Sequence, residues 1–419
     1  MVGLLDGLVD GPSGHSDESV TLIALQSEFG EGIGCAAVMV GQGPESGGVR
    51  HSWAFLAVLP LVALGVAVLV ALSLISTSIG GAAVLVGTMA AVLPVVPVVA
   101  AFLWVDRWEP EPWRLLLGAF LWGAGVAVLG AALVNDTATA IGERSLGSGG
   151  GDLVAAVISA PLAEEAFKGA FLIGLLWLRR REFDGVVDGI VYAGVVAAGF
   201  AFTENILYFG RAFALDGGVA FVFLVRGVLA PFAHPVFTAM TGIAVGLVAR
   251  RRSLPDRVLL PSAVYLGGGY LGAVGLHALW NASAGLGYLP AFYSVIMVPL
   301  FGALIAMVLW LHRREQRMVS AALPGFASAG WIAPSEVPLL ASQVGRRGWL
   351  GEVRRQAGED AAGAVRDYQN AVNELAFLSD RVQRGTASPD TRRWHHEAVA
   401  ELIAARDRAV RAPEQQRRE

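Results

Sequence analysis

The chemistry in this sequence is concentrated in one apolar segment, SAPLAEEAFKGAFLIGLLWL at residues 159–178, which contains Glu164, Glu165 and Lys168. On insertion scales each charge at the centre of a membrane helix costs about 2.5–3.5 kcal/mol, so the arrangement calls for a functional reason. On a helix both carboxylates can reach the Lys168 ammonium group. Lys168 is also the only lysine in the chain, which indicates a demand for a compact ammonium group rather than for any cation.

Three other apolar segments carry polar side chains that could join this group. These candidate site residues are Glu204, Asn205, His234, His277 and Asn281. At 1.5 Å per residue, all four segments place their polar groups between the outer third and the centre of a bilayer about 30 Å thick. We therefore expect a shared, water-filled pocket. A buried ion pair that only locks two helices together is the structural alternative.

Composition places the chain among polytopic membrane proteins, because 55% of its residues are hydrophobic and only 16% are charged. The net charge of −4 and the lack of a basic patch argue against a nucleic-acid partner. Cys35 is the single cysteine, which excludes an internal disulfide and a cysteine metal cluster. Abundant Ala, Val, Gly and Arg suggest a GC-rich bacterial genome.

Eight apolar runs are each long enough to span a bilayer. They lie near residues 53–75, 81–105, 115–135, 152–178, 186–209, 219–249, 258–284 and 288–311. The fold class is therefore all-α, a membrane bundle of about eight transmembrane helices. The sixth run contains Pro231 and Pro235, so we expect it to be kinked or broken near its middle. Arginines follow every second run, which predicts a multi-pass protein of the plasma membrane with both termini in the cytoplasm.

Three regions follow from these patterns: a disordered cytoplasmic leader at 1–50, the membrane domain at 51–315, and a cytoplasmic linker with a helical tail at 316–419. The stretch LPGFASAGWIAPSEVPLLASQ predicts a Pro- and Gly-rich linker, and charged helices are expected over 359–384 and 390–411.

The loop DRWEPEPWR at residues 106–114 connects the second and third runs. Its aromatic side chains Trp108 and Trp113 favour an interfacial turn. Alternatively, its acidic side chains, among them Asp106 and Glu111, recruit a partner at the cytoplasmic surface. The sequence does not decide between these two interpretations.

The motifs EEAFK at 164–168, FAFTEN at 200–205, His234 and HALWN at 277–281 follow in order on successive membrane segments. Together they resemble the motif set of the PrsW family of intramembrane proteases, which is related to the CAAX prenyl endopeptidases. The resemblance covers roughly residues 100–315. It implies cleavage of a single-span, membrane-anchored protein, such as an anti-sigma factor, near the outer face of the lipid bilayer. In the CAAX group the second motif ends in His, where this chain has Glu204.

Peptide hydrolysis requires a base that activates water, a group that holds the oxyanion, and a proton for the leaving amine. We expect Glu164 or Glu165 to act on water while Lys168 orients or neutralises the other carboxylate. His277 and Asn281 lie four residues apart on one helical face and are the candidates for the oxyanion site.

His234 and Glu204 are the candidates for donating the proton or positioning water. A rival mechanism gathers Glu165, Glu204, His234 and His277 around a zinc ion, although no HExxH motif occurs. We expect the metal-free, glutamate-activated mechanism. A proton-coupled transporter is the alternative function, because transporters use the same buried groups.

Overall fold

The computed structural model describes residues 50–147, 150–179, 183–215, 218–251, 259–383 and 389–416. These residues form helices joined by short turns, and no strand occurs within those ranges. The all-α prediction is therefore confirmed. Apart from Arg50, the leader predicted at residues 1–50 lies outside the described residues.

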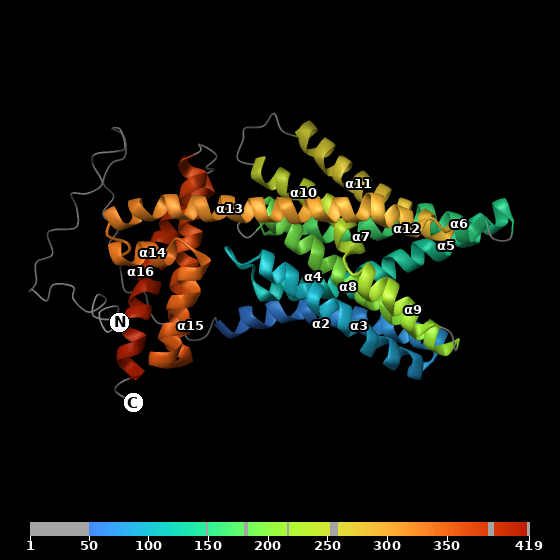
Figure 1. The fold of residues 1–419 in the computed structure, drawn as a ribbon, viewed down its shortest axis with the longest axis horizontal. Coiled ribbons are helices and arrows are strands. Elements are labelled where there is room, and N and C mark those ends of the chain that lie inside the picture. Colours follow the sequence, from blue (N-terminus) through green and yellow to red (C-terminus); the bar gives the residue numbers. More distant parts are fainter. Residues whose placement is uncertain are drawn as a thin grey trace, which may run out of the picture. The chain divides into compact units, whose positions relative to one another are not determined.

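The first four predicted spans all form helical stretches, shown in blue to green in Figure 1. They consist of α2 (Arg50–Ile79), α3 (Gly81–Val105), α4 (Trp113–Leu121), the π-helical turn η1 (Trp122–Ala127), α5 (Val128–Leu146), α6 (Gly150–Val154), the π-helical turn η2 (Ala155–Ser159) and α7 (Ala160–Leu178). The π-helical turns lie inside otherwise continuous helices, next to the segments that carry the candidate site.

The last four predicted spans also form helical stretches. They consist of α8 (Val186–Ala214), α9 (Val219–Phe223), η3 (Leu224–Leu229), α10 (Ala233–Arg251), α11 (Leu259–Gly285), α12 (Leu289–Phe292), η4 (Tyr293–Met297) and α13 (Val298–Ser328). Six stretches in the described part of the chain are long and apolar enough to cross a membrane. The other two predicted spans form α7, which carries three charges, and α11. The protein is a polytopic helical membrane bundle, and its orientation stays a prediction.

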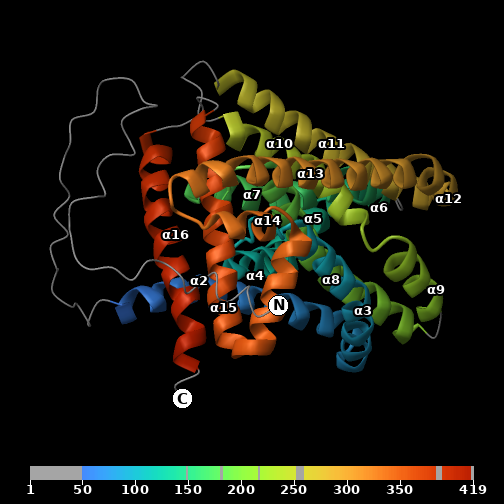
Figure 2. The ribbon, with the colours of Figure 1, turned by 60° about the vertical axis from the view of Figure 1, so that its left-hand side comes forward.

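The sixth span is interrupted, as the prolines predicted. Residues 230–232 form a turn between η3 and α10, so that α9 and α10 are separate segments in both ribbon views (Figures 1 and 2). Pro235 lies in the first turn of α10, where its missing N–H has no helical acceptor to lose. The interruption places His234 in the same first turn, where α10 begins.

Helix α8 lies at the centre of the bundle and is buried along most of its length. It packs on α3 and on α10. A Cβ atom built on Gly189 of α8 would lie 2.1 Å from the carbonyl oxygen of Gly242 on α10, so a larger residue could not occupy this position without moving one helix. Such close contact between small residues is typical of membrane helices, and it holds together the two helices that carry Glu204 and His234.

The described part of the chain divides into two compact units, Ser52–Arg313 and a second one that begins at Arg314. Helix α13 continues to Ser328, so the predicted linker is wrong over its first residues. The reason is local: Val319, Leu323 and Phe326 recur at helical spacing and are buried, which outweighs Pro324 and Gly325.

The second unit contains η5 (Pro334–Glu336), α14 (Val337–Leu340), α15 (Gln343–Gln383) and α16 (Pro389–Gln416). Helix α15 is interrupted at Ala357 and Gly358, and the segment after this kink is the first of the two charged helices predicted from sequence. The Tyr368 hydroxyl group donates to Glu336 Oε2 at 2.8 Å, which joins α15 to η5. Most of the predicted GTASPD connection lies outside the described residues.

Candidate active site

Lys168 lies fully buried on α7, at the centre of the candidate site. Its Nζ atom is 2.9 Å from Glu165 Oε1 and 3.4 Å from Glu164 Oε2. The same atom is 3.1 Å from Nδ1 of His234 and 4.1 Å from the centroid of the Phe200 ring. An ammonium group has three N–H donors, and these three acceptors match them. A branched guanidinium group would not reproduce this arrangement, which explains the single lysine.

The two adjacent carboxylates differ in how fully they are bonded. Glu165 accepts hydrogen bonds from Lys168, from the Thr238 hydroxyl group at 2.8 Å and from His277 Nδ1 at 3.2 Å. Glu164 makes longer contacts, at 3.4 Å to Lys168 and 3.8 Å to His277 Nε2. Glu165 is therefore held as part of the structure, whereas Glu164 retains acceptor capacity for a water molecule or an ion.

His277 lies between the two adjacent carboxylates. A carboxylate only accepts, so Nδ1–H donates to Glu165 at 3.2 Å, while Nε2 lies 3.8 Å from Glu164 Oε2. The His277 ring stacks on Phe237, with centroids 5.0 Å apart and planes at 21°, which holds its orientation. Nε2 is therefore the ring nitrogen of His277 that is not hydrogen-bonded to Glu165 and that remains for a ligand or a substrate.

His234 is held in the same manner by the third carboxylate. Its Nε2–H donates to Glu204 Oε2 at 2.8 Å, and its Nδ1 accepts from Lys168. Its ring lies edge-on to that of His277, with centroids 5.1 Å apart. Each imidazole thus bonds one nitrogen to a carboxylate, while the other nitrogen lies against Lys168 in His234 and toward Glu164 in His277.

Arg226 of η3 pairs with Glu204. Its Nη2 contacts Glu204 Oε2, its Nε donates to Asn205 Oδ1 at 2.8 Å, and its guanidinium group lies 3.9 Å from the Tyr208 ring centroid. Asn205 therefore bonds to Arg226, which contacts Glu204, and of these three residues only Glu204 bonds to His234. Arg226 and Asn205 together orient Glu204.

Asn281 takes a different position from the one that its spacing predicted. Its side-chain amide donates to the carbonyl oxygen of Ala156 at 2.8 Å, within the π-helical turn η2. Its donor therefore ties α11 to the start of the α7 span. Thr238, which the sequence analysis missed, reaches Glu165 instead, and the signal was present: it follows His234 by four residues on the same helical face.

The charges of this cluster do not cancel within its described residues. Three carboxylates, those of Glu164, Glu165 and Glu204, face two permanent cations, Lys168 and Arg226. One negative charge remains to be compensated by a proton or a bound cation, because an unpaired charge at this depth is costly. Glu164, the least engaged carboxylate, is where that compensation is needed.

One donor set in the described part of the chain could hold a metal ion. One ligand atom each from Glu164, His234 and His277 lie within 4.8 Å of one another. Two imidazoles and one carboxylate form a recognised ligand set of catalytic zinc, and the carboxylates of Glu165 and Glu204 orient the two imidazoles as outer-sphere partners do. The residues present therefore fit a metal, with Glu164 in place of the Glu165 and Glu204 ligands expected from sequence, provided that His234 Nδ1 binds the metal instead of Lys168 Nζ.

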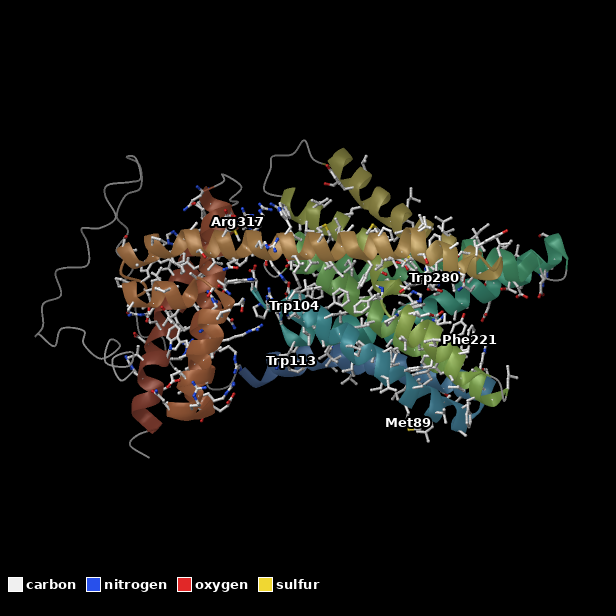
Figure 3. The ribbon with its side chains drawn as sticks, in the orientation of Figure 1. Met89, Trp104, Trp113, Phe221, Trp280 and Arg317 are labelled. Carbon is white, nitrogen blue, oxygen red and sulfur yellow. The ribbon has the colours of Figure 1, made fainter. Side chains whose placement is uncertain are left out.

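A second group of buried carboxylates lies in the loop between α3 and α4. Asp106 accepts the backbone N–H of Glu111 at 2.8 Å, and Glu111 accepts the Tyr192 hydroxyl group at 2.8 Å. Burial raises the pKa of Asp106 to about 8 and that of Glu111 to about 10. Trp108 is buried and Trp113 exposed, so the loop folds onto the bundle through Trp108 (Figure 3 labels Trp113).

The fold and the site define a class: a helical membrane protein with a carboxylate, histidine and lysine cluster buried inside its bundle. The chain belongs to the PrsW family of intramembrane metalloproteases, whose family model matches residues 111–327. That range contains every residue of the cluster. No solved structure matches the chain.

Individual relatives agree with this assignment. The chain is 30% identical over 157 residues to Protease PrsW of Clostridioides difficile strain 630, over 36% of this chain and 62% of the relative. It is 32% identical over 157 residues to Protease PrsW of Geobacillus kaustophilus, over 38% and 64%. It is 29% identical over 182 residues to Protease PrsW of Bacillus subtilis strain 168, over 42% of this chain and 78% of the relative. The chain thus spans just over three fifths of the length of the first two relatives.

Proposed function

We propose that this protein is an intramembrane endopeptidase that hydrolyses a peptide bond in a membrane-anchored protein, such as a single-span anti-sigma factor. The observation that carries the proposal is the unequal bonding of the two adjacent carboxylates, which leaves Glu164 available beside two oriented imidazoles. Membership of a protease family supports hydrolysis over proton-coupled transport.

Glu164 is the residue that we assign to water activation. Lys168, Thr238 and His277 together satisfy Glu165, so Glu165 neutralises the lysine and orients His277. A water molecule that attacks the scissile carbonyl loses one proton, and the leaving amine gains one. A carboxylate that takes the first proton can return it to the amine. Glu204 and His234, which are hydrogen-bonded to each other next to Lys168, are the second pair of groups that could donate a proton or position the water molecule.

The donor set Glu164, His234 and His277 would be the ligands of a divalent metal such as zinc. When bound, zinc would lower the pKa of a coordinated water molecule to about 7 and polarise the scissile carbonyl group. The position of His277 supports this arrangement, because its Nδ1 is bonded to Glu165 and its Nε2 lies toward Glu164. The preference for a metal-free mechanism stays a prediction. In either mechanism, loss of Glu164 removes water activation.

The test uses purified full-length protein in nanodiscs with a panel of tagged single-span membrane proteins. Wild type is compared with Glu164→Gln, Glu165→Gln and His277→Ala, each with and without a chelator, and the metal content of each sample is measured by mass spectrometry. The exposed carboxylate of Glu143 on α5 provides the matched control, Glu143→Gln.

Cleavage by wild type and by the control, but not by Glu164→Gln, is the expected result. Loss on chelation with recovery on adding zinc, together with stoichiometric metal in wild type and not in His277→Ala, assigns the donor set to a metal. Cleavage that survives chelation in a metal-free sample assigns Glu164 to direct proton transfer. Cleavage by all three site variants at the wild-type rate contradicts the proposal.

A further inference from the structure

A cavity of about 240 Å³ lies inside the membrane bundle, on another face of α10 from the one that carries Thr238 toward Glu165. It lies between helices α3, α8, α10 and α13, and every lining side chain is apolar. The lining is Ala101, Phe102, Trp104, Val105, Ile190, Phe232, Pro235, Val236, Ala239, Phe301, Leu304, Ile305, Val308 and Leu309. Water needs two to four polar partners, so it would gain little here. An occupant of this cavity would therefore be apolar.

The cavity opens sideways, between α3 and α13. Most of its lining is buried or half-buried, and its exposed side chains come from these two helices alone: Trp104, Phe301, Ile305 and Leu309. Both helices are among the stretches that can cross a membrane, so the opening faces the bilayer. Lipid chains therefore have direct access to it.

The shape of the cavity favours a single acyl chain. Its α13 lining runs from Phe301 to Leu309, which corresponds to about 12 Å along the helix at 1.5 Å per residue. A transmembrane helix is about 10–12 Å wide with its side chains, so a 12 Å length of it would occupy roughly 900–1,400 Å³ and could not enter a cavity of about 240 Å³. For comparison, an engineered apolar cavity of about 150 Å³ is large enough to bind benzene.

The end of the cavity near the loop carries a cation. Arg107 directly follows α3, and its guanidinium group lies 4.2 Å from the centroid of the Trp104 ring, which lines the cavity and is labelled in Figure 3. At the same end His312 donates from Nε2 to the Val105 carbonyl oxygen at 2.7 Å, which joins α13 to α3. Arginine binds phosphate oxygens well, and basic groups beside membrane helices bind lipid headgroups.

We propose that this cavity binds one acyl chain of a phospholipid whose phosphate group is bound by Arg107. The lipid stabilises the contact between α13 and the bundle by filling space that no protein side chain fills. It also packs against Phe232, Pro235 and Val236, which flank His234 where α10 begins. This site is separate from the proposed hydrolytic chemistry, and its test does not depend on activity.

The test reconstitutes the full-length protein in nanodiscs that contain phosphatidylglycerol with a photoreactive diazirine on one acyl chain, and maps labelled residues by mass spectrometry. Two variants, Ala101→Phe and Ala239→Leu, each fill the cavity. Ala306→Phe on an exposed position of α13 that does not line the cavity is the matched control. Labelling of lining residues is expected in wild type and in Ala306→Phe, and it should be lost in both filling variants.

The headgroup is tested with Arg107→Ala and with a diazirine-labelled diacylglycerol, which lacks phosphate. Both changes should weaken labelling of the cavity relative to phosphatidylglycerol on wild type. Equal labelling by the two lipids would overturn the assignment of Arg107. Labelling spread over exposed membrane faces, or unaffected by both filling variants, would identify adventitious annular lipid only and overturn the site.

Discussion

Two sets of buried carboxylates in the same bundle are stabilised by different means. The first set belongs to the candidate active site, which we call the α7 cluster and which consists of Glu164, Glu165, Lys168, Glu204, Arg226, His234 and His277. In this cluster Glu165 is paired with Lys168, and Glu204 with Arg226. In the loop between α3 and α4, Asp106 and Glu111 bond to a backbone N–H and a tyrosine hydroxyl group, and burial raises the pKa of both carboxyl groups.

The difference shows how identical side chains acquire different chemistry. Glu111, with a pKa raised to about 10, holds a proton at neutral pH and acts as a neutral hydrogen-bonding group. The carboxylates of the α7 cluster instead lie beside cations and imidazoles. Burial alone therefore does not identify a reactive carboxylate, but burial combined with a cation and an imidazole is a strong indication.

The largest effect that we expect is on hydrolysis by Glu164→Gln. This change keeps the shape of the side chain and removes its capacity to take a proton, so the cleavage rate should fall by roughly 10²–10⁴-fold. Cleavage of a tagged substrate in nanodiscs measures it, with Glu111→Gln as the buried control from the other carboxylate group. Equal losses in both variants would erase the distinction between the two groups.

Lys168→Met should cause the largest loss of stability. It removes the cation from two buried carboxylates, and breaking a buried pair in this way costs about 3–5 kcal/mol. Glu111→Gln should not lower the unfolding free energy in this way, because the carboxyl group that it replaces is already neutral in the folded protein. Unfolding in mixed micelles measures both. A Lys168→Met protein as stable as wild type would show that the cluster is not ionised as described.

Arg226→Lys tests the second layer of the α7 cluster. Lysine keeps the charge but cannot contact Glu204 and Asn205 together while lying over the Tyr208 ring. Loss of such a supporting contact typically costs roughly 10–100-fold in activity or metal affinity. We expect a loss of that size with a shifted pH profile for cleavage. An unchanged pH profile for cleavage would mean that Arg226 supports the fold and does not orient Glu204 for the reaction.

The smallest effect, expressed per pH unit, concerns the loop between α3 and α4. The pKa of Asp106 and that of Glu111 are raised in the folded protein, so folding binds protons and stability falls as pH rises from about 4 toward about 8 to 10. Each group contributes a slope of at most about 1.4 kcal/mol per pH unit. Unfolding free energies measured between pH 5 and 9 should show this slope, and Asp106→Asn combined with Glu111→Gln should flatten it. A slope of opposite sign would refute the assignment.

The sequence predicted the fold closely because membrane spans depend on local properties. Length, hydropathy and proline positions are read along one segment, so the eight runs and the break before His234 were recognisable. The linker prediction failed over residues 323–328, because composition near Pro324 and Gly325 was given more weight than the buried, helically spaced Val319, Leu323 and Phe326.

The candidate site was only partly predictable. Spacing within α7 correctly linked Glu164 and Glu165 to Lys168, since residues three and four apart share a helical face. Spacing within α11 suggested that Asn281 and His277 act at one point, yet Asn281 bonds to Ala156. Helical spacing predicts that two residues lie on the same side of a helix. It does not predict which residues of neighbouring helices their side chains contact.

The sequence by itself thus determined that this is a helical membrane protein with carboxylates, histidines and one lysine inside its spans, because burying such groups in an apolar segment is costly wherever the segment packs. Only the tertiary structure decided that Glu165 is the bonded carboxylate and Glu164 the available one, and that Arg226 supports Glu204. Those roles depend on contacts between helices far apart in the chain, which are set by how closely α7, α8, α10 and α11 pack.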